Sequence, residues 1–179
     1  VNETLHPAKA TARMQLLRGD KSTDDSQEIE IAPGMVTKVF DIDMAQAPAA
    51  FLLLKLGDDI INEYFIVSEK DTYDWDKTTR VHTPITKYAS YAMLDSLCTT
   101  DVKLTTTPTN DGYQVQVSNP TDKVAFMIRL TAKNQGELIC PAYWSDNYLT
   151  LAPGKTRTVT CRMPSLTDKT KVEIGVFKQ

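Results

Sequence analysis

The sequence has few of the residues on which catalytic and metal sites are usually built. Its 179 residues include only two histidines, three cysteines and seven glycines. His6 and His82 lie far apart in the sequence, so we expect neither a catalytic triad nor a histidine-based metal site. No glycine-rich phosphate loop and no G-x-S-x-G motif occurs. We therefore expect no catalytic residue, no metal site and no cofactor in this chain.

The cysteines are odd in number and have no C-x-x-C spacing. This excludes a disulfide framework or a structural zinc site as the organising principle of the fold. Cys98 is left without an obvious role. Two alternatives stay open for Cys140 and Cys161: they pair across a β-sandwich, or they stay free and fill a core.

Long apolar runs and a basic excess are also missing. No run approaches the ~20 residues that a membrane-spanning helix needs. The net charge is −3 with 24% charged residues, and no stripe of lysine and arginine is present. These features exclude membrane insertion and nucleic acid as expected partners. The chain starts at Val1 with no signal peptide, so we expect a mature or excised fragment of a longer polypeptide.

Alternation of apolar and polar residues is what the sequence has in abundance. A two-residue period predicts half-buried β-strands, and sustained helical periodicity is nearly missing. Phe51 to Leu56 and Ile60 to Val67, separated by a Gly-Asp-Asp turn, predict a hairpin. The fold class is therefore expected to be all-β. The other alternating segments are 12–16, 102–106, 113–117, 124–130, 159–163 and 172–176.

An internal repeat indicates two related modules. Ile29-Glu30-Ile31-Ala32-Pro33-Gly34 is echoed by Leu149-Thr150-Leu151-Ala152-Pro153-Gly154, and a strand is expected after each, at Met35 to Ile42 and at Lys155 to Met163. Val1-Asn2-Glu3-Thr4 similarly matches Val117 to Thr121. The second copy has two expected strands before its asparagine, whereas nothing precedes the first.

The repeat predicts three parts. Residues 1–68 form a β-sandwich that lacks its first strands, residues 69–100 form an ordered aromatic connector with a short helix or turn, and residues 101–179 form a second β-sandwich. Bulky aromatics in the connector indicate that it packs against the domains. The candidates for such a domain interface are Trp75, Tyr88 and Tyr91.

One aromatic run is the best candidate for a binding site. Aromatic rings can stack on sugar rings while short polar groups bond the hydroxyls. The same residues can instead cover the end of a sandwich and form an Asx turn. Both alternatives stay open at this point. The candidates are Tyr143, Trp144, Asp146, Asn147 and Tyr148.

Several of these segments together resemble the C-terminal part of glycoside hydrolase family 2. The likeness is strongest to exo-β-D-glucosaminidases and related β-mannosidase-type enzymes. It is carried by Asp71-Thr72-Tyr73-Asp74-Trp75, Thr83-Pro84, Tyr88-Ala89, the run from Tyr143 to Tyr148, and Pro153-Gly154.

The resemblance implies that residues 1–68 and 101–179 are two immunoglobulin-like antiparallel β-sandwich domains. It also implies that they are accessory domains of a retaining glycoside hydrolase whose two catalytic glutamates lie on a (β/α)₈ barrel outside this chain. The barrel of the parent chain is then the partner, an oligosaccharide is a second possible ligand, and an extracytoplasmic location is implied. The fragment alone is expected to be non-catalytic, bracing the barrel and bordering its substrate entrance. Two alternatives stay open: a stand-alone carbohydrate-binding module, and a surface adhesin of tandem immunoglobulin-like domains.

Overall fold

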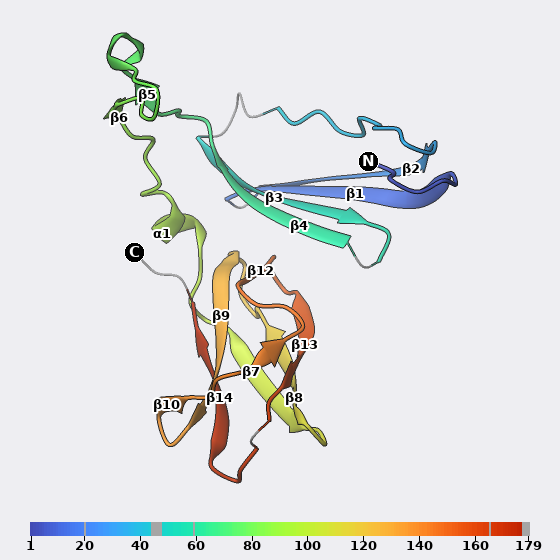
Figure 1. The fold of residues 1–179 in the computed structure, drawn as a ribbon, viewed down its shortest axis with the longest axis vertical. Coiled ribbons are helices and arrows are strands. Elements are labelled where there is room, and N and C mark those ends of the chain that lie inside the picture. Colours follow the sequence, from blue (N-terminus) through green and yellow to red (C-terminus); the bar gives the residue numbers. More distant parts are fainter. Residues whose placement is uncertain (20, 44–47, 59, 165, 177–179) are drawn as a thin grey trace. The chain divides into compact units, whose positions relative to one another are not determined.

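The computed structural model describes residues 1–19, 21–43, 48–58, 60–164 and 166–176. They fall into two compact units, Val1–Met93 and Leu94–Gln179. Within the described residues the only α-helix is a single turn, α1, and one short 3-10 turn, η1, accompanies it. The expected all-β class is confirmed (Figure 1). No helix of the described residues is long and apolar enough to span a membrane.

The first unit is built on a four-stranded antiparallel sheet with the order β2-β1-β3-β4. Its strands are β1 (Ala8–Arg18), β2 (Lys21–Ile31), β3 (Ala49–Leu56) and β4 (Ile60–Val67). The predicted hairpin is confirmed, since Ala49 faces Val67 along a continuous β3–β4 ladder. Gly57, with φ 61°, supplies the left-handed backbone of its turn. The buried centre of the sheet consists of Met14, Leu16, Ala50 and Leu52.

The strand predicted at Met35 to Ile42 is wrong. Residues 35–43 form no strand; they run along the sheet as an extended segment (Figure 1). Phe40 packs on the buried centre, and the carbonyl of Val39 accepts a bond from Gln27 Nε2. Extended backbone becomes a strand only when a neighbouring strand takes up its hydrogen bonds. No such neighbour exists among the described residues of this unit.

The rest of the first unit is an ordered connector. It contains the small sheet of β5 (Thr72–Tyr73) and β6 (Ile85–Lys87), with η1 (Trp75–Lys77) between them. The carboxylate of Asp74 caps η1 by accepting from the Lys77 amide at 3.2 Å. The division at residues 68 and 100 stays a prediction.

The second unit contains two facing sheets, as an immunoglobulin-like sandwich requires. One sheet has β9 at its centre, flanked by β10 and β12 on one side and β14 on the other; the second has the order β11-β13-β8-β7. Eight buried apolar residues, among them Val115, Ile128 and Val159, form the core between them. The elements are α1 (Leu94–Leu97), β7 (Lys103–Pro108), β8 (Gly112–Ser118), β9 (Ala125–Asn134), β10 (Glu137–Leu138), β11 (Tyr143–Trp144), β12 (Leu149–Leu151), β13 (Thr156–Arg162) and β14 (Thr170–Gly175).

A buried asparagine explains one half of the sequence repeat. Asn119 is 1% exposed. Its Nδ2 donates to the carbonyls of Lys123 and Leu151 at 2.7 and 3.0 Å, and its Oδ1 accepts from the amide and hydroxyl of Thr121. One side chain therefore ties the end of β8 to β12 and to the loop that leads into β9.

Asn2 makes the same set of bonds in the first unit. Its Nδ2 donates to the carbonyls of His6 and Ile31 at 2.8 and 2.9 Å, and its Oδ1 accepts from Thr4. The repeat is thus a structural one. Asn2-Glu3-Thr4 also reads as an N-glycosylation sequon, but Asn2 is 4% exposed and its amide nitrogen is engaged. Glycosylation of the folded unit at Asn2 is therefore excluded.

The three cysteines are free, so the alternative in which Cys140 and Cys161 pair is wrong for this structure. Burial raises the pKa of the Cys161 thiol to about 11. Burial, reinforced by the charge of Asp95, raises the pKa of Cys98 to about 11. Cys140 is exposed.

This difference predicts selective labelling. Because the thiolate is the reactive form, iodoacetamide at about pH 8 should modify Cys140 and spare Cys98 and Cys161. Mass spectrometry of the folded chain should show one modified thiol, and unfolding in guanidinium chloride should expose all three. Equal labelling of Cys161 and Cys140 in the folded chain would contradict the burial described here.

Candidate functional site

The aromatic run forms the connection between the two sheets of the second unit. Tyr143 and Trp144 make up β11 and pair with Arg162 and Cys161 of β13. β12 begins at Leu149 and pairs with β9 in the opposite sheet. Residues 145–148 therefore cross from one sheet to the other.

Ser145 and Asn147 tie this crossing to both sheets. The Ser145 amide donates to the Thr160 carbonyl, and the Ser145 hydroxyl accepts from the Thr160 amide, both at 2.9 Å. On the other sheet, Asn147 Oδ1 accepts from the Leu130 amide at 2.8 Å and Nδ2 donates to the Leu130 carbonyl at 2.9 Å. A side-chain amide thus takes the place of a neighbouring strand beside Leu130 on β9.

Trp144 and Asp146 are also engaged by the fold. Trp144 is half-buried and packs on the core between the sheets. Asp146 accepts from the amide of the next residue, Asn147, through Oδ1 at 2.9 Å, and its Oδ2 lies 3.2 Å from Nη1 of Arg157. This polar network fixes the loop.

Tyr143 and Tyr148 differ from their neighbours because their side chains face solvent. They are 58% and 53% exposed. Tyr148 has φ 56°, a left-handed conformation that few non-glycine residues adopt, and its amide is held by Asn147 Oδ1 at 2.9 Å. The five predicted residues are therefore brought together, with three engaged in fixing the loop and two rings presented outward.

The interface candidates lie in the first unit. Trp75 and Tyr88 are each 71% exposed, and Trp75 lies beside Tyr73 with 5.4 Å between ring centroids. Tyr91 packs on Phe65 of β4 with 6.0 Å between centroids. Their role at a domain interface stays a prediction.

The first unit also contains an open groove of roughly 1150 Å³ that the sequence did not predict. Tyr64 of β4, 51% exposed, lines it together with Tyr73, Trp75 and Tyr91. The alternation of β4 could have indicated that Tyr64 faces outward. It could not show that the connector returns to the same strand.

Within the described residues, no group of three or more histidine, cysteine, aspartate or glutamate side chains is arranged to hold a metal ion. The aromatic rings of Tyr143 and Tyr148 offer flat apolar faces beside a fixed carboxylate and amide.

Comparison with known families identifies the C-terminal half of the chain, from the end of the first unit through the second. Residues 80–177 match the sequence profile of the family described as "Exo-beta-D-glucosaminidase Ig-fold domain". The chain belongs to this family. The resemblance to exo-β-D-glucosaminidases noted in the sequence is thereby confirmed, as is the immunoglobulin-like sandwich.

Individual relatives agree with this exo-β-D-glucosaminidase family. The chain is 31% identical over 136 residues to an exo-beta-D-glucosaminidase of Arthroderma benhamiae, which covers 72% of the chain and 15% of that protein. It is 34% identical over 118 residues to one of Hypocrea jecorina, covering 58% and 13%. The chain thus spans less than a sixth of the length of these curated relatives.

Solved structures show the same fold across nearly the whole chain. The crystal structure of Amycolatopsis orientalis exo-chitosanase CsxA matches 98% of this chain and 23% of its own, with a TM-score of 0.76 and 19% identity. This likeness covers both units, although the family profile covers only residues 80–177. The curated relatives, at 31% and 34% identity, show in addition that the chain is homologous to a portion of the longer exo-β-D-glucosaminidases.

Proposed function

We propose that this chain is the non-catalytic, C-terminal immunoglobulin-like part of a retaining exo-β-D-glucosaminidase or β-mannosidase-like enzyme of glycoside hydrolase family 2. It braces a catalytic (β/α)₈ barrel elsewhere in the same polypeptide, and it acts outside the cytoplasm. The observation that carries this proposal is the family match over residues 80–177, supported by a fold likeness to exo-chitosanase CsxA over 98% of the chain.

Within this role, the loop from Tyr143 to Tyr148 borders the substrate entrance. Tyr143 and Tyr148 supply ring faces for sugar stacking, while Trp144, Asp146 and Asn147 hold the loop in place. Trp75, Tyr88 and Tyr91 supply apolar surface for a domain interface.

The test of the entrance role uses the whole parent enzyme. Tyr148→Ala should raise KM for chitosan oligosaccharides about two- to thirteenfold with little change in kcat, because stacking on an aromatic ring contributes about 0.5–1.5 kcal/mol. The matched control is Tyr64→Ala, since Tyr64 is exposed to a similar degree but lies on β4. Equal KM values for both variants and the unchanged enzyme would contradict the proposal that the loop borders the substrate entrance.

The isolated 179-residue chain separates this proposal from its alternatives. We expect no hydrolysis of p-nitrophenyl β-D-glucosaminide and little heat on titration with chitosan oligosaccharides. Hydrolysis by the chain itself would overturn the non-catalytic assignment. Tight binding that Tyr148→Ala abolishes would instead show a self-sufficient carbohydrate-binding module.

A further inference from the structure

Three non-glycine residues of the described part of the chain have a left-handed backbone. They are Met127, Gln135 and Tyr148, with φ of 51°, 53° and 56°. Gln135 is explained by its turn, because it lies in the two-residue connection between β9 and β10, and such hairpins favour positive φ at both central residues. Met127 lies inside β9 and Tyr148 directly precedes β12, so no hairpin turn accounts for either of them.

Met127 lies in a β-bulge. Leu149 of β12 faces Ile128 of β9, whereas Leu151 faces Ala125, so β9 has one residue more than β12 between these two pairs. A left-handed residue in a bulge is usually glycine, because a Cβ is disfavoured in that conformation. Methionine at this position therefore carries a backbone strain that glycine would not have.

The two left-handed residues lie beside the same pair of facing residues. Met127 directly precedes Ile128, and Tyr148 directly precedes Leu149, the residue that Ile128 faces. Figure 1 shows β12 beside β9. Because the two strands are antiparallel, Met127 and Tyr148 are diagonal neighbours across the pair. Such neighbours are about 7–8 Å apart, within reach of aromatic and long side chains.

Both side chains lie on the outer face of this sheet. Ile128 and Leu149 are 0% and 1% exposed and belong to the core of the second unit. Since successive side chains of a strand point to opposite faces, the residues beside them point outward. Met127 is 38% exposed and Tyr148 53% exposed. A thioether and an aromatic ring therefore share one surface where β12 begins.

We propose that Met127 is a second sugar-contacting residue of the substrate entrance. Its thioether side chain and the ring of Tyr148 together hold the apolar face of one sugar ring of a β-linked glucosamine oligosaccharide. This inference rests on the entrance role proposed above for Tyr148. Residues held in rarely populated backbone conformations are concentrated at ligand sites, and an unbranched, polarizable methionine can adapt its shape to a ring.

The test combines binding and stability of Met127→Gly. Glycine removes the side chain together with the backbone strain, so the thermal unfolding midpoint of the 179-residue chain should stay the same or rise. In the parent enzyme, KM for chitosan oligosaccharides should nevertheless increase about two- to tenfold with little change in kcat, because the sugar loses one apolar contact.

Two further variants serve as controls. Met127→Leu should keep KM within about twofold of the unchanged enzyme, because leucine has a similar apolar volume. Leu138→Ala removes another exposed apolar side chain of the second unit, 56% exposed on β10, and should leave KM unchanged.

Two outcomes would overturn the role of Met127 alone. One is an unchanged KM for Met127→Gly when Tyr148→Ala raises it. The other is a lower unfolding midpoint of Met127→Gly together with the raised KM, because damage to the fold would then explain the weaker binding. An unchanged KM for both Met127→Gly and Tyr148→Ala would contradict the entrance role itself, and the role of Met127 with it.

Discussion

Replacing Asn119 with alanine should lower the free energy of unfolding of the second unit by about 3 kcal/mol. The side chain is 1% exposed and holds five hydrogen bonds from one amide group. Without it, the carbonyl of Leu151 loses this donor, whereas the carbonyl of Ala152 still accepts from the Lys155 amide at 3.1 Å. An unsatisfied buried polar group costs about 1–3 kcal/mol. The lost bonds to Lys123 and Thr121 add to this loss.

The measurement is urea unfolding followed by tryptophan fluorescence in a Trp75→Phe background, where Trp144 alone reports on the second unit. Asn110→Ala, at an exposed asparagine in the turn between β7 and β8, is the control and should change stability by less than about 0.5 kcal/mol. Asn119→Asp keeps the shape but replaces the donor with an oxygen facing carbonyls. It should be at least as destabilising as Asn119→Ala above the pKa of the new carboxylate, and a stable aspartate variant would contradict the role of Nδ2 as donor.

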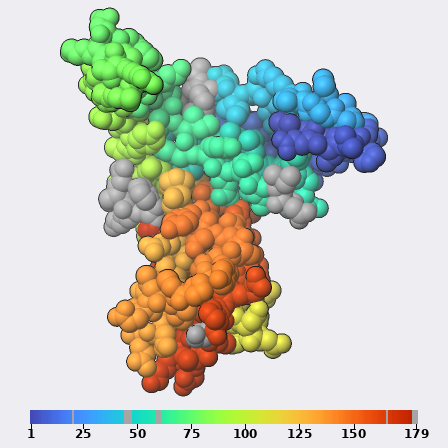
Figure 2. Space-filling view, in the orientation of Figure 1, coloured from blue at the N-terminus to red at the C-terminus, as the bar shows by residue number. Residues whose placement is uncertain are grey.

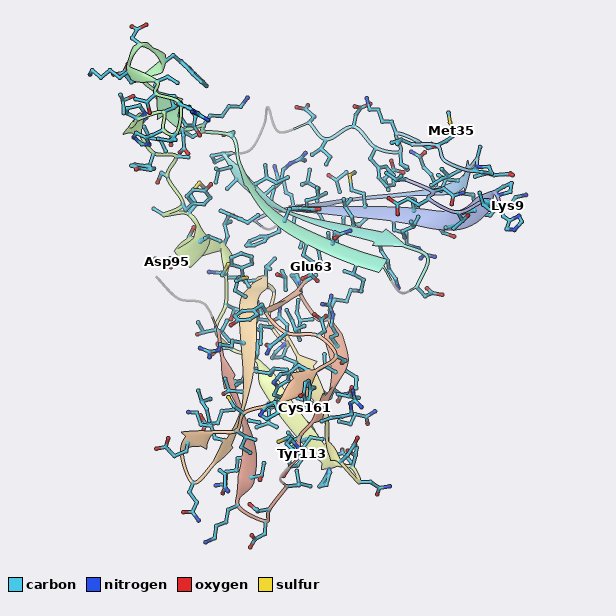
Figure 3. All side chains as sticks on the ribbon, viewed as in Figure 1. Lys9, Met35, Glu63, Asp95, Tyr113 and Cys161 are labelled. Atoms are coloured by element: carbon cyan, nitrogen blue, oxygen red, sulfur yellow. The ribbon has the colours of Figure 1, made fainter. Side chains whose placement is uncertain are left out.

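The second large effect is expected from Gly112→Ala. A Cβ on Gly112 would lie 1.9 Å from the carbonyl oxygen of Cys161 and 3.1 Å from the Cα of Arg162. All the atoms it meets belong to the backbone of β13, so no rotamer change can relieve the clash. Overpacking of this kind costs about 3 kcal/mol when strands must move apart. Figure 3 shows Cys161 close to Tyr113, the residue that faces it on β8.

The control for this variant is Gly175→Ala. Gly175 also lies in a strand, β14, but a Cβ there meets nothing within 4 Å. Thermal unfolding should show a clear drop in midpoint for Gly112→Ala and almost none for Gly175→Ala. A similar drop for both would attribute the effect to lost glycine flexibility instead of the close approach of β8 and β13.

Alternation and the repeat were sufficient to predict much of this fold. The hairpin of β3 and β4 follows from two apolar runs around a glycine turn. The two asparagines that correspond in the repeat, Asn2 and Asn119, make corresponding hydrogen bonds in the two units. The strand predicted at residues 35–42 was wrong because alternation shows only that a segment is compatible with a strand. Whether the strand forms depends on a neighbouring strand elsewhere in the chain. Figure 2 shows residues 33–43, in light blue, at the surface of the first unit.

The sequence predicted where the candidate site lies. It did not predict which of its residues hold the loop in place and which face solvent. Nothing in the spacing of Tyr143 to Tyr148 shows that Asn147 bonds Leu130, because that contact depends on how β9 passes beneath the loop. Nor does it distinguish the half-buried ring of Trp144 from the exposed ring of Tyr148. These distinctions arise from tertiary packing.

The crossing from Ser145 to Tyr148 is anchored to both sheets before any ligand arrives. A surface of this kind loses little conformational entropy when it is occupied, so contacts made by its outward rings are not offset by a cost of ordering. Tyr143 and Tyr148 can also be exchanged for other side chains while the anchoring bonds remain. Under the entrance role proposed above, the ligand preference of this loop can therefore change through two residues while the sandwich that carries it stays unaltered.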